Sequence, residues 1–585
     1  MTSDRQLFND DPTLRGDQGQ LTPSSADTPA SGRAAAARRS ALWAAYGDAL
    51  GWTSELTDDA GLRRRTRGEP LKTPISWKRH IGGRGGLTVL LPAGCYSDDT
   101  QLRLATSRAI GPNGFDVEAF SKVELPVWLG YALGGGNSTK AAARNLAKPS
   151  TSWFVNTYRG WLESGGNGAA MRIQPHIWAA PELDNPAGYL VDVMRNSICT
   201  HAHPVGLIGA VIHALTLAYT MMTGAIPQAE DLTRLTESAG ELPAILANDS
   251  EAGQYWLTSW ERHSRQSFRD TWTLTVKDTL DVIAKAATAV RTGEPDERYH
   301  ALIDALNLTD QGRRGSGQLS AIAAVALTWC EPRPVEAMIL AANALGTDTD
   351  TIATMAGALL GAACTEEPPG DIVDRQLISA EAERLTALAA GSTDILVHPY
   401  PDLLNWSAPK TQADALVTTL DGQLHVLGLG SVVRTLSEPL TAAQGGFAWQ
   451  WVLLAIGQTL LIKRRGQLFT IPHLRQGIGD TDNATSRRRT SEARSVSVLD
   501  RTPHTDERSE PVREPEPTGA SRRTAHTSRE SQSGRPLDLD RVIAYLHREQ
   551  LSDHAIGYAV RRVAREGTPE QVAAFLAVLL DLTRR

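Results

Sequence analysis

Cysteine is scarce in this chain: four cysteines occur among 585 residues, and no two of them have the CxxC spacing. They are Cys95, Cys199, Cys330 and Cys364. A disulfide framework or a structural zinc site requires cysteines in closely spaced sets. The sequence therefore argues against both, and it is typical of a reducing compartment, which we expect to be the cytoplasm.

Long hydrophobic runs and an excess of basic charge are also missing. The most apolar stretch, Phe447–Ile462, contains two glutamines and is shorter than the roughly 20 residues of a membrane-spanning helix, so we interpret it as buried core. The first residues, MTSDRQLFNDD, are polar and acidic, which predicts no secretory signal. The net charge of −7 gives no global footprint for nucleic-acid binding. We therefore expect neither a membrane nor a nucleic acid among the partners.

Apolar residues are depleted in two segments. Residues 1–35 are rich in Asp, Ser, Thr, Pro and Gly, and residues 479–535 consist mainly of Arg, Ser, Thr, Glu and Pro. Neither composition buries enough apolar surface to offset the entropy cost of ordering the chain. The sequence predicts a disordered N-terminus and a disordered linker, and the mixed charge of the linker favours a solvated tether over a nucleic-acid-binding tail.

Residues 36–392 contain Ala-, Leu- and Val-rich runs at helical periodicity, broken by Gly and Pro. Clear examples are Ala202–Thr223, Leu319–Cys330 and Pro334–Leu345. The alternation that is typical of strands is scarce in this region. The sequence predicts an all-α domain here.

Residues 410–475 have a different character, with two pairs of apolar segments that each flank a turn dipeptide. The dipeptides are Asp421-Gly422 and Arg465-Gly466, and Asp-Gly in particular favours a hairpin turn. The flanking segments are Ala415–Leu420 with Leu424–Leu429, and Leu460–Ile462 with Gln467–Ile471. We expect a small β-rich module, with a strand-bearing lid on the helical domain as the equally weighted alternative.

Residues 536–585 regain helical periodicity. Thr568-Pro569-Glu570-Gln571 has the form of a capping box with Pro at the first helical position. A unit of about fifty residues buries only a small core. We therefore expect a helical interaction unit that is stabilised by docking onto the helical domain of its own chain, onto a protein partner or onto a second copy of itself.

Two acidic clusters each stand directly before a helical run. They are Ser97-Asp98-Asp99-Thr100 and Asp348-Thr349-Asp350-Thr351. Carboxylate and hydroxyl oxygens are the ligands that Mg²⁺ and similar hard cations prefer, and four carboxylates brought together repel one another unless cations neutralise them. The alternative interpretation is that both clusters are ordinary helix caps.

Five motifs together resemble the ADP-ribosylglycohydrolase family, in the order in which that family carries them. They are Gly47-Asp48-Ala49-Leu50-Gly51 with Glu55, then Tyr96–Thr100, Gly166-Asn167-Gly168 through Arg172, Thr200-His201 with Gly209-Ala210, and Gly346–Thr351. The resemblance covers residues 36–392. The family usually has a second glycine where this chain has Thr347, which leaves the expected metal-binding side chains in place but puts the geometry of that loop in doubt.

The resemblance implies three sets of residues. A pair of Mg²⁺ ions, or Mn²⁺ in their place, would be held by Ser97, Asp98, Asp99, Asp348, Asp350 and Thr351. ADP-ribose would be bound by Ser164, Gly166, Asn167, Gly168 and His201. Catalysis would depend on Glu55, Asp98, Asp99 and Asp350.

Several of these residues have a plainer interpretation beside the functional one. His201 lies on what we expect to be an apolar helix, where a lone histidine is often only a core residue. Glu55 could be an exposed acid at a helix end, and Asp48 is better explained as support for the first motif. The glycines of Gly134–Asn137 offer backbone donors to an anion, but such a stretch is more often a turn.

The expected activity is metal-dependent hydrolysis of the N- or O-glycosidic bond that joins ADP-ribose to a protein or a small molecule. Three alternatives remain at this point. The chain could bind ADP-ribose without turnover as a regulatory or immunity protein, it could cleave the diphosphate as a phosphohydrolase, or it could act mainly through its C-terminal tail.

Overall fold

The computed structural model describes residues 29–403, 405–442, 446–471, 539–548, 551, 553–566 and 569–584. The chain divides into two compact units, residues 1–486 and residues 487–585, which are described separately. Residues 1–28 of the predicted N-terminal tail and the whole predicted linker, residues 479–535, lie outside the described residues. The first helix begins at Pro29, earlier than the expected boundary at residue 36.

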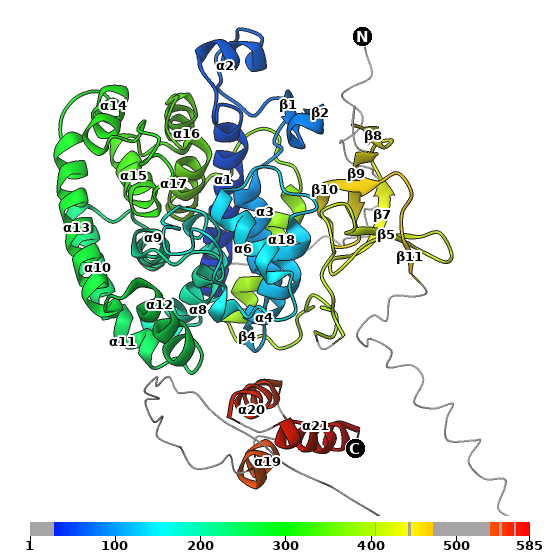
Figure 1. Cartoon of the computed structure of the whole chain (residues 1–585). Coiled ribbons are helices and arrows are strands. Elements are labelled where there is room, and N and C mark those ends of the chain that lie inside the picture. The colour runs from blue at the N-terminus through cyan, green and yellow to red at the C-terminus, as the bar shows by residue number, and fades with distance from the viewer. Residues whose placement is uncertain are drawn as a thin grey trace, which may run out of the picture. The chain divides into compact units, whose positions relative to one another are not determined.

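The first unit is mostly helical, which confirms the predicted fold class (Figure 1). Its helices are α1 (Pro29–Trp52), α2 (Asp59–Thr66), α3 (Asp98–Arg108), α4 (Val117–Ala119), α5 (Leu125–Trp128), α6 (Asn137–Leu146), α7 (Gln174–Trp178), α8 (Pro186–Ile198), α9 (Pro204–Thr223), α10 (Ala229–Ser238), α11 (Leu242–Ala247), α12 (Leu257–Ser264), α13 (Phe268–Ala289), α14 (Pro295–Leu306), α15 (Gly317–Cys330), α16 (Pro334–Asn343), α17 (Thr349–Ala363) and α18 (Arg375–Ala389). Two short antiparallel hairpins interrupt them, β1 (Trp77–Ile81) with β2 (Leu87–Leu91), and β3 (Ile110–Gly111) with β4 (Gly114–Phe115).

The centre of the helical unit is the packing of α1 against α17. Two glycines of α1 permit this close approach, because a Cβ on Gly47 would lie 2.4 Å from the Ala353 carbonyl oxygen and one on Gly51 would lie 2.3 Å from that of Thr349. No side chain fits in that space. The first sequence motif therefore places the end of α1 directly beside the start of α17.

Helix α9 is the one helix among the described residues that is long and apolar enough to cross a membrane. Most of it is buried inside the unit, where it packs against α8, α15 and α17. An apolar helix that is covered on all sides by other helices is a core helix.

The second layer of this unit is a seven-stranded sheet, drawn in yellow in Figure 1. Its strands are β5 (Leu416–Thr419), β6 (Leu424–Val426), β7 (Gly430–Thr435), β8 (Leu440–Thr441), β9 (Phe447–Leu454), β10 (Thr459–Arg465) and β11 (Thr470–Ile471). The order is β10-β9-β7-β6-β5-β11, and β8 pairs with β9. A small β-rich module is thus confirmed between residues 416 and 471, whereas residues 472–475 of the expected module lie outside the described residues.

One of the two expected hairpins is present. Strands β5 and β6 pair in antiparallel fashion around Asp421-Gly422, where Gly422 has φ 87°. The hairpin expected around Arg465-Gly466 is wrong, because β10 pairs with β9 around Gly457 and β11 pairs in parallel with β5. The apolar strand β9 offers β10 a long partner that is mostly buried, whereas the short β11 segment follows an exposed Phe469.

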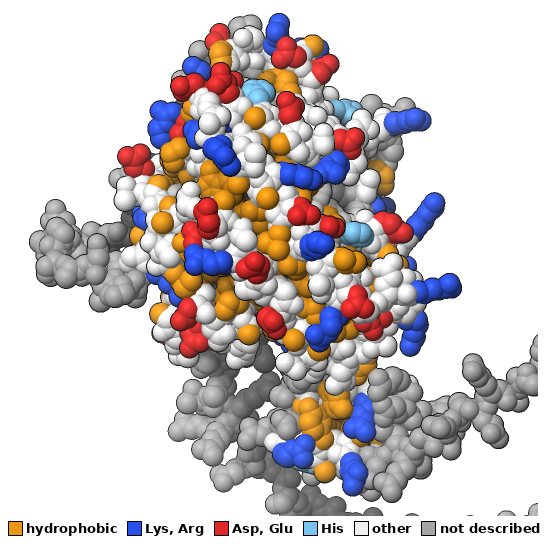
Figure 2. All heavy atoms as spheres, turned by 90° about the vertical axis from the view of Figure 1, so that its left-hand side faces the viewer, with side chains coloured by type: hydrophobic (Ala, Val, Ile, Leu, Met, Phe, Trp, Pro, Cys, Tyr) orange, Lys and Arg blue, Asp and Glu red, His pale blue; other side chains and the backbone are white. Residues whose placement is uncertain are grey.

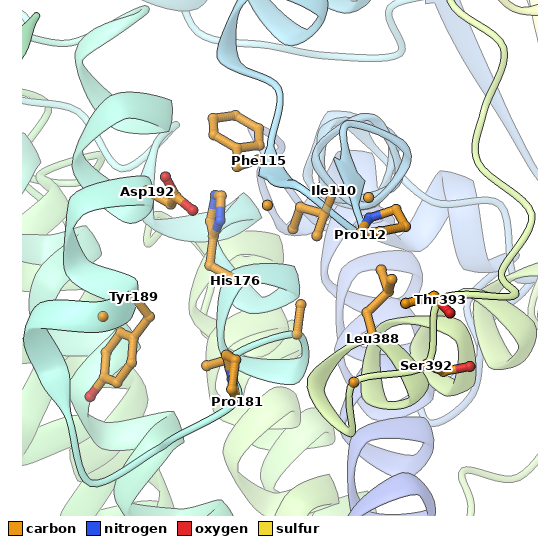
Figure 3. Close-up of a pocket in the computed structure, with 16 residues that line it drawn as sticks. Ile110, Pro112, Phe115, His176, Pro181, Tyr189, Asp192, Leu388, Ser392 and Thr393 are labelled. Carbon is orange, nitrogen blue, oxygen red and sulfur yellow. The ribbon is translucent and has the colours of Figure 1, made fainter. Parts of the chain in front are cut away.

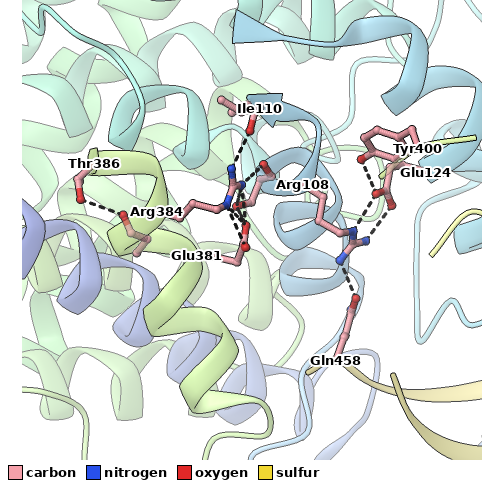
Figure 4. Close-up of polar contacts among 10 residues, drawn as sticks. Arg108, Ile110, Glu124, Glu381, Arg384, Thr386, Tyr400 and Gln458 are labelled. Carbon is pink, nitrogen blue, oxygen red and sulfur yellow. Dashed lines mark hydrogen bonds and ion pairs between the residues drawn. The ribbon is translucent and has the colours of Figure 1, made fainter. Parts of the chain in front are cut away.

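Buried polar contacts attach the sheet to the helices (Figure 4). The Arg108 guanidinium donates to both carboxylate oxygens of Glu124 at 2.8 Å and to Gln458 Oε1 at 2.7 Å, and the Tyr400 hydroxyl donates to Glu124 Oε1 at 2.7 Å. Gln458 lies in the β9–β10 turn. Because buried charges are retained only when they are paired and hydrogen-bonded, this network fixes the sheet on α3.

The face of the helical unit shown in Figure 2 carries acidic and basic side chains interspersed with apolar ones. Mixed charge of this kind is typical of a solvated surface rather than of an extended electrostatic footprint.

The second unit consists of α19 (Leu539–Arg548), α20 (Asp553–Glu566) and α21 (Pro569–Arg584). A small core holds them together, to which Val542, Leu546, Ala559 and Phe575 contribute. On α21, Leu576 and Leu580 are 44% and 56% exposed at i, i+4 spacing, so one apolar stripe of this helix is uncovered within the unit.

Candidate active site

Asp48, near the end of α1, organises the start of α3. Its Oδ1 accepts a hydrogen bond from the Ser97 backbone N–H at 2.9 Å, and its Oδ2 accepts from the Thr100 N–H at 2.9 Å and from the Thr100 hydroxyl at 2.6 Å. These are donors that the first turn of a helix leaves without intrahelical partners. Ser97 completes the cap, because its Oγ accepts from the Asp99 N–H at 3.2 Å.

The N-terminus of α17 meets the N-terminus of α3. The Thr351 hydroxyl lies 3.5 Å from Asp99 Oδ1, and the Thr349 hydroxyl donates to the Gly51 carbonyl at 2.8 Å. The two acidic clusters, far apart in the sequence, thereby come together at the end of α1. Both helix dipoles direct their positive ends toward this point, where they favour negative charge.

Thr347, which stands where the family usually has a second glycine, fits into its loop without backbone strain. The left-handed backbone angle of this loop falls on Gly346, with φ 90°, and not on Thr347. The Thr347 hydroxyl donates to the Ala344 carbonyl at 2.8 Å. The loop therefore reaches Asp348 and Asp350 without a second glycine.

The Gly-Asn-Gly loop lies against the second acidic cluster. Asn167 Nδ2 donates to Asp348 Oδ2 at 3.1 Å and to Ser320 Oγ at 3.0 Å, and the Asn167 N–H donates to the Gly315 carbonyl at 2.9 Å. The side chain of Asn167 thus orients a carboxylate of the site. Gly168 is closely packed, since a Cβ there would lie 2.8 Å from Thr139 Oγ1.

His201 contacts this loop from a turn. The expectation that it lies on a helix is wrong, because the residue falls between α8 and α9, whose first turn begins at Pro204. His201 Nδ1 lies 2.7 Å from Thr200 Oγ1, and Nε2 lies 3.4 Å from the position of a Cβ on Gly168. Burial lowers the pKa of His201 to about 3, so the ring is neutral.

Ser164 supports the Gly-Asn-Gly loop through hydrogen bonds of its hydroxyl. Its hydroxyl contacts the Trp161 carbonyl and accepts a hydrogen bond from the Ala202 N–H at 2.8 Å, and the side chain is buried. The hydroxyl is therefore already used by the fold, and its expected contact with ADP-ribose stays a prediction.

Burial and mutual repulsion raise the proton affinity of the carboxylates. Burial, followed by the charge of Glu55, raises the pKa of Asp98 to about 7. The pKa of Asp99 rises through burial and then through Asp48 and Asp98, and that of Asp350 rises through burial and then through Glu55 and Asp99. Perturbed carboxylates that cluster in this way are typical of a functional site.

One buried carboxylate oxygen of the cluster has no hydrogen-bond partner among the described residues. Asp99 Oδ2 is buried and accepts no hydrogen bond. Among the described residues, no three His, Cys, Asp or Glu side chains are placed to hold a single ion by themselves. A cation at this point would therefore need hydroxyl or water oxygens in addition to the carboxylates, and Ser97 and Thr351 supply such hydroxyls.

Glu55 stands apart from the other acids, in the turn after α1. Its Oε2 lies 3.5 Å from Arg79 Nη2, and its side chain is 22% exposed. Burial raises the pKa of Glu55, whereas Arg79 lowers it and Asp348 raises it further. The side chain thus faces the acidic cluster without joining the caps of either helix.

The loop of Gly134 and Gly135 belongs to the site. A Cβ on Gly134 would lie 2.4 Å from Asp98 Oδ1, and the two residues have φ 123° and 92°. A backbone hydrogen bond from Gly135 stabilises the charged form of Asp98. The stretch is therefore both a turn and a wall of the site.

Sequence reasoning missed the basic groups that balance the acids. Lys140 on α6 lies near Asp98, and the buried Arg103 donates from Nη2 to Thr100 Oγ1 at 2.6 Å. Arg79 comes from the β1–β2 hairpin. Only the helical spacing of Arg103 and Thr100 could have indicated one of these pairs, because the others join separate elements.

A hollow of about 370 Å³ lies elsewhere and holds none of the predicted site residues. It is lined by the β3–β4 hairpin, α7, α8 and the residues after α18, and Figure 3 shows His176 between Asp192 and Ile110. Ile110 follows the last turn of α3, and this 11-residue helix is about 16 Å long. The acidic cluster, at the first turn of α3, is thus a separate site.

Parts of this chain are similar to known proteins. The chain is 26% identical over 332 residues to the uncharacterized protein YegU of Escherichia coli (strain K12), which covers 55% of this chain and 86% of YegU. It is 31% identical over 182 residues to the ADP-ribosyl-[dinitrogen reductase] glycohydrolase of Rhodospirillum rubrum, covering 30% of this chain and 55% of that protein. A solved structure described as an ADP-ribosylglycohydrolase-related protein complex covers 61% of this chain and 99% of its own, with 19% identity and a TM-score of 0.39. Residues 31–394 match the family described as ADP-ribosylglycohydrolase, and the chain belongs to that family.

Proposed function

We propose that this chain hydrolyses the N- or O-glycosidic bond between ADP-ribose and a protein or another acceptor, and that divalent cations take part. The observation that carries the proposal is the meeting of the α3 and α17 N-termini, with Thr351 3.5 Å from Asp99. Around this point lie five aspartates, one glutamate and the Gly-Asn-Gly loop. Family membership supports the class of reaction.

The chemical type of these donor atoms fits magnesium, although the side chains that the structure describes do not form a complete set of ligands for one ion. Carboxylate and hydroxyl oxygens are the ligands that Mg²⁺ prefers, and Mn²⁺ accepts the same set. The buried Asp99 Oδ2, which has no hydrogen-bond partner, is the oxygen most in need of a positive charge. The residues that would hold two ions are Ser97, Asp98, Asp99, Asp348, Asp350 and Thr351. When bound, Mg²⁺ polarises hydroxyl ligands and lowers the pKa of a water molecule.

The acids of the site divide into two roles. Hydrolysis of a glycosidic bond needs a group that accepts a proton from water and a group that acts on the leaving group. Asp98, Asp99 or Asp350 would accept the proton, because burial and repulsion raise the pKa of each of them. Glu55 would face the leaving group, since it lies outside the helix caps and is partly exposed.

Two residues would hold this constellation rather than react. Asn167 orients Asp348 through its amide, and Asp48 fixes the first turn of α3. The neutral ring of His201 lies against the same loop and would contact the ribose part of ADP-ribose through Nε2.

The test is to incubate the full chain and Mg²⁺ with arginine-, serine- and base-linked ADP-ribose and with O-acetyl-ADP-ribose, and to identify the released fragment by mass spectrometry. Intact ADP-ribose is the expected product from at least one substrate. Release of AMP, with phosphoribose left on the acceptor, would instead show a phosphohydrolase. Tight binding of ADP-ribose without any product would show a binding protein.

A further inference from the structure

We infer that Arg79 is a positioning residue for Glu55: it fixes the glutamate carboxylate at the site, and the aromatic pair of Trp52 and Trp77 fixes Arg79. The inference rests on the proposed function, because it assigns Arg79 a part in the same hydrolysis. Arg79 contacts none of the proposed cation-binding side chains by hydrogen bond, and it would act only through Glu55.

The turn that carries Glu55 is held under strain. Leu56, the next residue, has φ 53° and is 62% exposed, a left-handed conformation that a bulky side chain rarely adopts. Arg65 stabilises the turn, because its Nη1 donates to the Thr53 carbonyl at 2.8 Å and to the Glu55 carbonyl at 3.2 Å. Strained backbone of this kind persists where the surrounding structure holds it and is frequent at functional sites.

Arg65 fixes the backbone of the turn, and Arg79 fixes the side chain. The Arg79 guanidinium lies 3.5 Å from the Glu55 carboxylate, 4.7 Å from the centre of the Trp52 ring and 5.6 Å from that of Trp77. The two rings are 5.3 Å apart in an edge-to-face arrangement. A planar cation packed beside two aromatic rings loses most of its freedom, so the carboxylate beside it has one preferred position.

Not every donor nitrogen of the Arg79 guanidinium has a hydrogen-bond partner among the described residues. Its Nη1 is buried and has no hydrogen-bond partner. A buried donor without a partner lowers the stability of the fold, so stability alone does not account for a guanidinium at this place. Among the described residues, the acid that pairs with Arg79 is Glu55.

The sheet supports the hairpin on which Arg79 lies. Gly82, directly after β1, has φ 82°, and a Cβ there would lie 2.5 Å from the ring of Trp449 on β9. Trp449 belongs to the same buried cluster as Trp52 and Trp77. Figure 1 shows the hairpin beside the strands β8–β10. The sheet, the hairpin and Arg79 thus form a continuous support that ends at Glu55.

The experiment compares Arg79→Gln, Arg79→Lys and Glu55→Gln with the double variant Arg79→Gln/Glu55→Gln in the full chain with Mg²⁺. Arg63→Gln is the matched control, since Arg63 is 74% exposed on α2 and forms its ion pair, among the residues that the structure describes, with Asp59. The measurements are kcat and KM for the best substrate of the panel, the Kd for ADP-ribose and the melting temperature.

Arg79→Gln should lower kcat by on the order of 10²-fold, because misplacing a catalytic group by about 1 Å has that effect, while KM and the Kd for ADP-ribose stay near their wild-type values. Arg79→Lys should recover part of kcat, since the charge remains but the planar stacking is lost. In the double variant, Arg79→Gln should add no further loss to Glu55→Gln.

Two results overturn the inference while leaving the proposed function intact. One is wild-type turnover by Arg79→Gln in a panel where Glu55→Gln is slow. The other is a loss in the double variant that equals the product of the two single losses, which would show that Arg79 acts independently of Glu55. If the wild-type chain releases no ADP-ribose from any substrate, the proposed function fails and the inference fails with it.

Discussion

Asp48 Oδ2 accepts two hydrogen bonds from Thr100, one from its backbone N–H at 2.9 Å and one from its hydroxyl at 2.6 Å. Through this pair the end of α1 determines where the first turn of α3 begins, and with it the positions of Asp98 and Asp99. Asp48 is fully buried, and burial raises its pKa although the bonds from Thr100 and Ser97 lower it. Its role in the fold is that of a cap supplied from another helix.

Asp48→Asn should reduce both stability and turnover. An amide replaces one of the two acceptor oxygens with a donor, so that at least one buried N–H of the α3 start loses its partner, at about 1–3 kcal/mol. Urea unfolding and kcat of the variant measure the two effects. Asp59→Asn, at an exposed position on α2, is the control and should change neither. A variant with wild-type stability would show that the cap does not depend on the carboxylate.

Activity should depend on a divalent cation and on Asp350. Asp350 is buried, and the neighbouring acids Glu55, Asp99 and Asp348 raise its pKa, so the charged site needs a counter-charge. Exhaustive chelation should abolish turnover, and Mg²⁺ or Mn²⁺ should restore it. Asp350→Ala should lower kcat by orders of magnitude with the helical circular-dichroism signal unchanged. Full activity after chelation would contradict the proposed cation site.

Glu55→Gln should impair chemistry more than binding. The side chain lies outside both helix caps and is 22% exposed, so its amide would be accepted without refolding. We expect single-turnover hydrolysis to slow by roughly 10²–10⁴-fold, the contribution typical of a positioned acid or base, with little change in the Kd for ADP-ribose. A collapsed affinity with a preserved single-turnover rate would make Glu55 a binding residue instead.

The sequence contained the local part of this site. Ser97, Asp98 and Asp99 stand directly before a predicted helical run, and the structure places Ser97 at the N-cap of α3 and both aspartates in its first turn. The pairing of β5 with β6 was equally local, since Asp421-Gly422 specifies its own turn.

Contacts between residues that are far apart in the sequence could not be predicted in the same way. The bond from Thr100 to Asp48 joins positions 52 residues apart, and the pair of Arg79 and Glu55 depends on a short hairpin among helices. No periodicity within one segment encodes such contacts. The position of His201 was readable after all, because the proline at 204 favours the first turn of a helix and so places His201 before it.

Stability should fall with rising pH through Asp374, which joins the sheet to Tyr96, directly before the first acidic cluster. Its Oδ2 accepts from the Tyr96 hydroxyl at 2.6 Å and from the Thr459 N–H at 2.9 Å, and burial raises its pKa to about 6 despite these bonds. A carboxyl whose pKa is higher in the folded than in the unfolded chain contributes stability below the unfolded pKa and loses that contribution as the pH rises through the folded value.

Asp374→Asn isolates this effect from the other buried acids. Asparagine keeps an acceptor oxygen for Tyr96 and Thr459 and tolerates the left-handed φ of 60° at this position. The melting temperatures of the variant and the wild type should therefore be similar near about pH 4 and should diverge in favour of the variant up to about pH 7. Calorimetry across this range measures the difference. A difference that does not vary with pH would contradict the assignment.

Removal of the C-terminal unit should leave small-substrate hydrolysis nearly unchanged, whereas removal of the sheet should not. Residues 487–585 form their own compact unit, while the sheet shares buried contacts with α3 through Arg108 and Gln458 and with the β1–β2 hairpin through Trp449. A chain truncated after residue 478 keeps every proposed site residue and its supports. A chain truncated after residue 410 loses Gln458, one of the two partners of the buried Arg108, and the ring behind Gly82, so both its stability and its kcat should drop.

The C-terminal unit is expected to bind a protein partner through α21, which exposes Leu576 and Leu580. Pull-down with the full chain and with the chain truncated after residue 478 should show at least one protein that only the full chain captures. The double variant Leu576→Ser/Leu580→Ser should abolish that capture. Loss of small-substrate turnover in a well-folded 478 truncation would instead show that the C-terminal unit contributes to the active site.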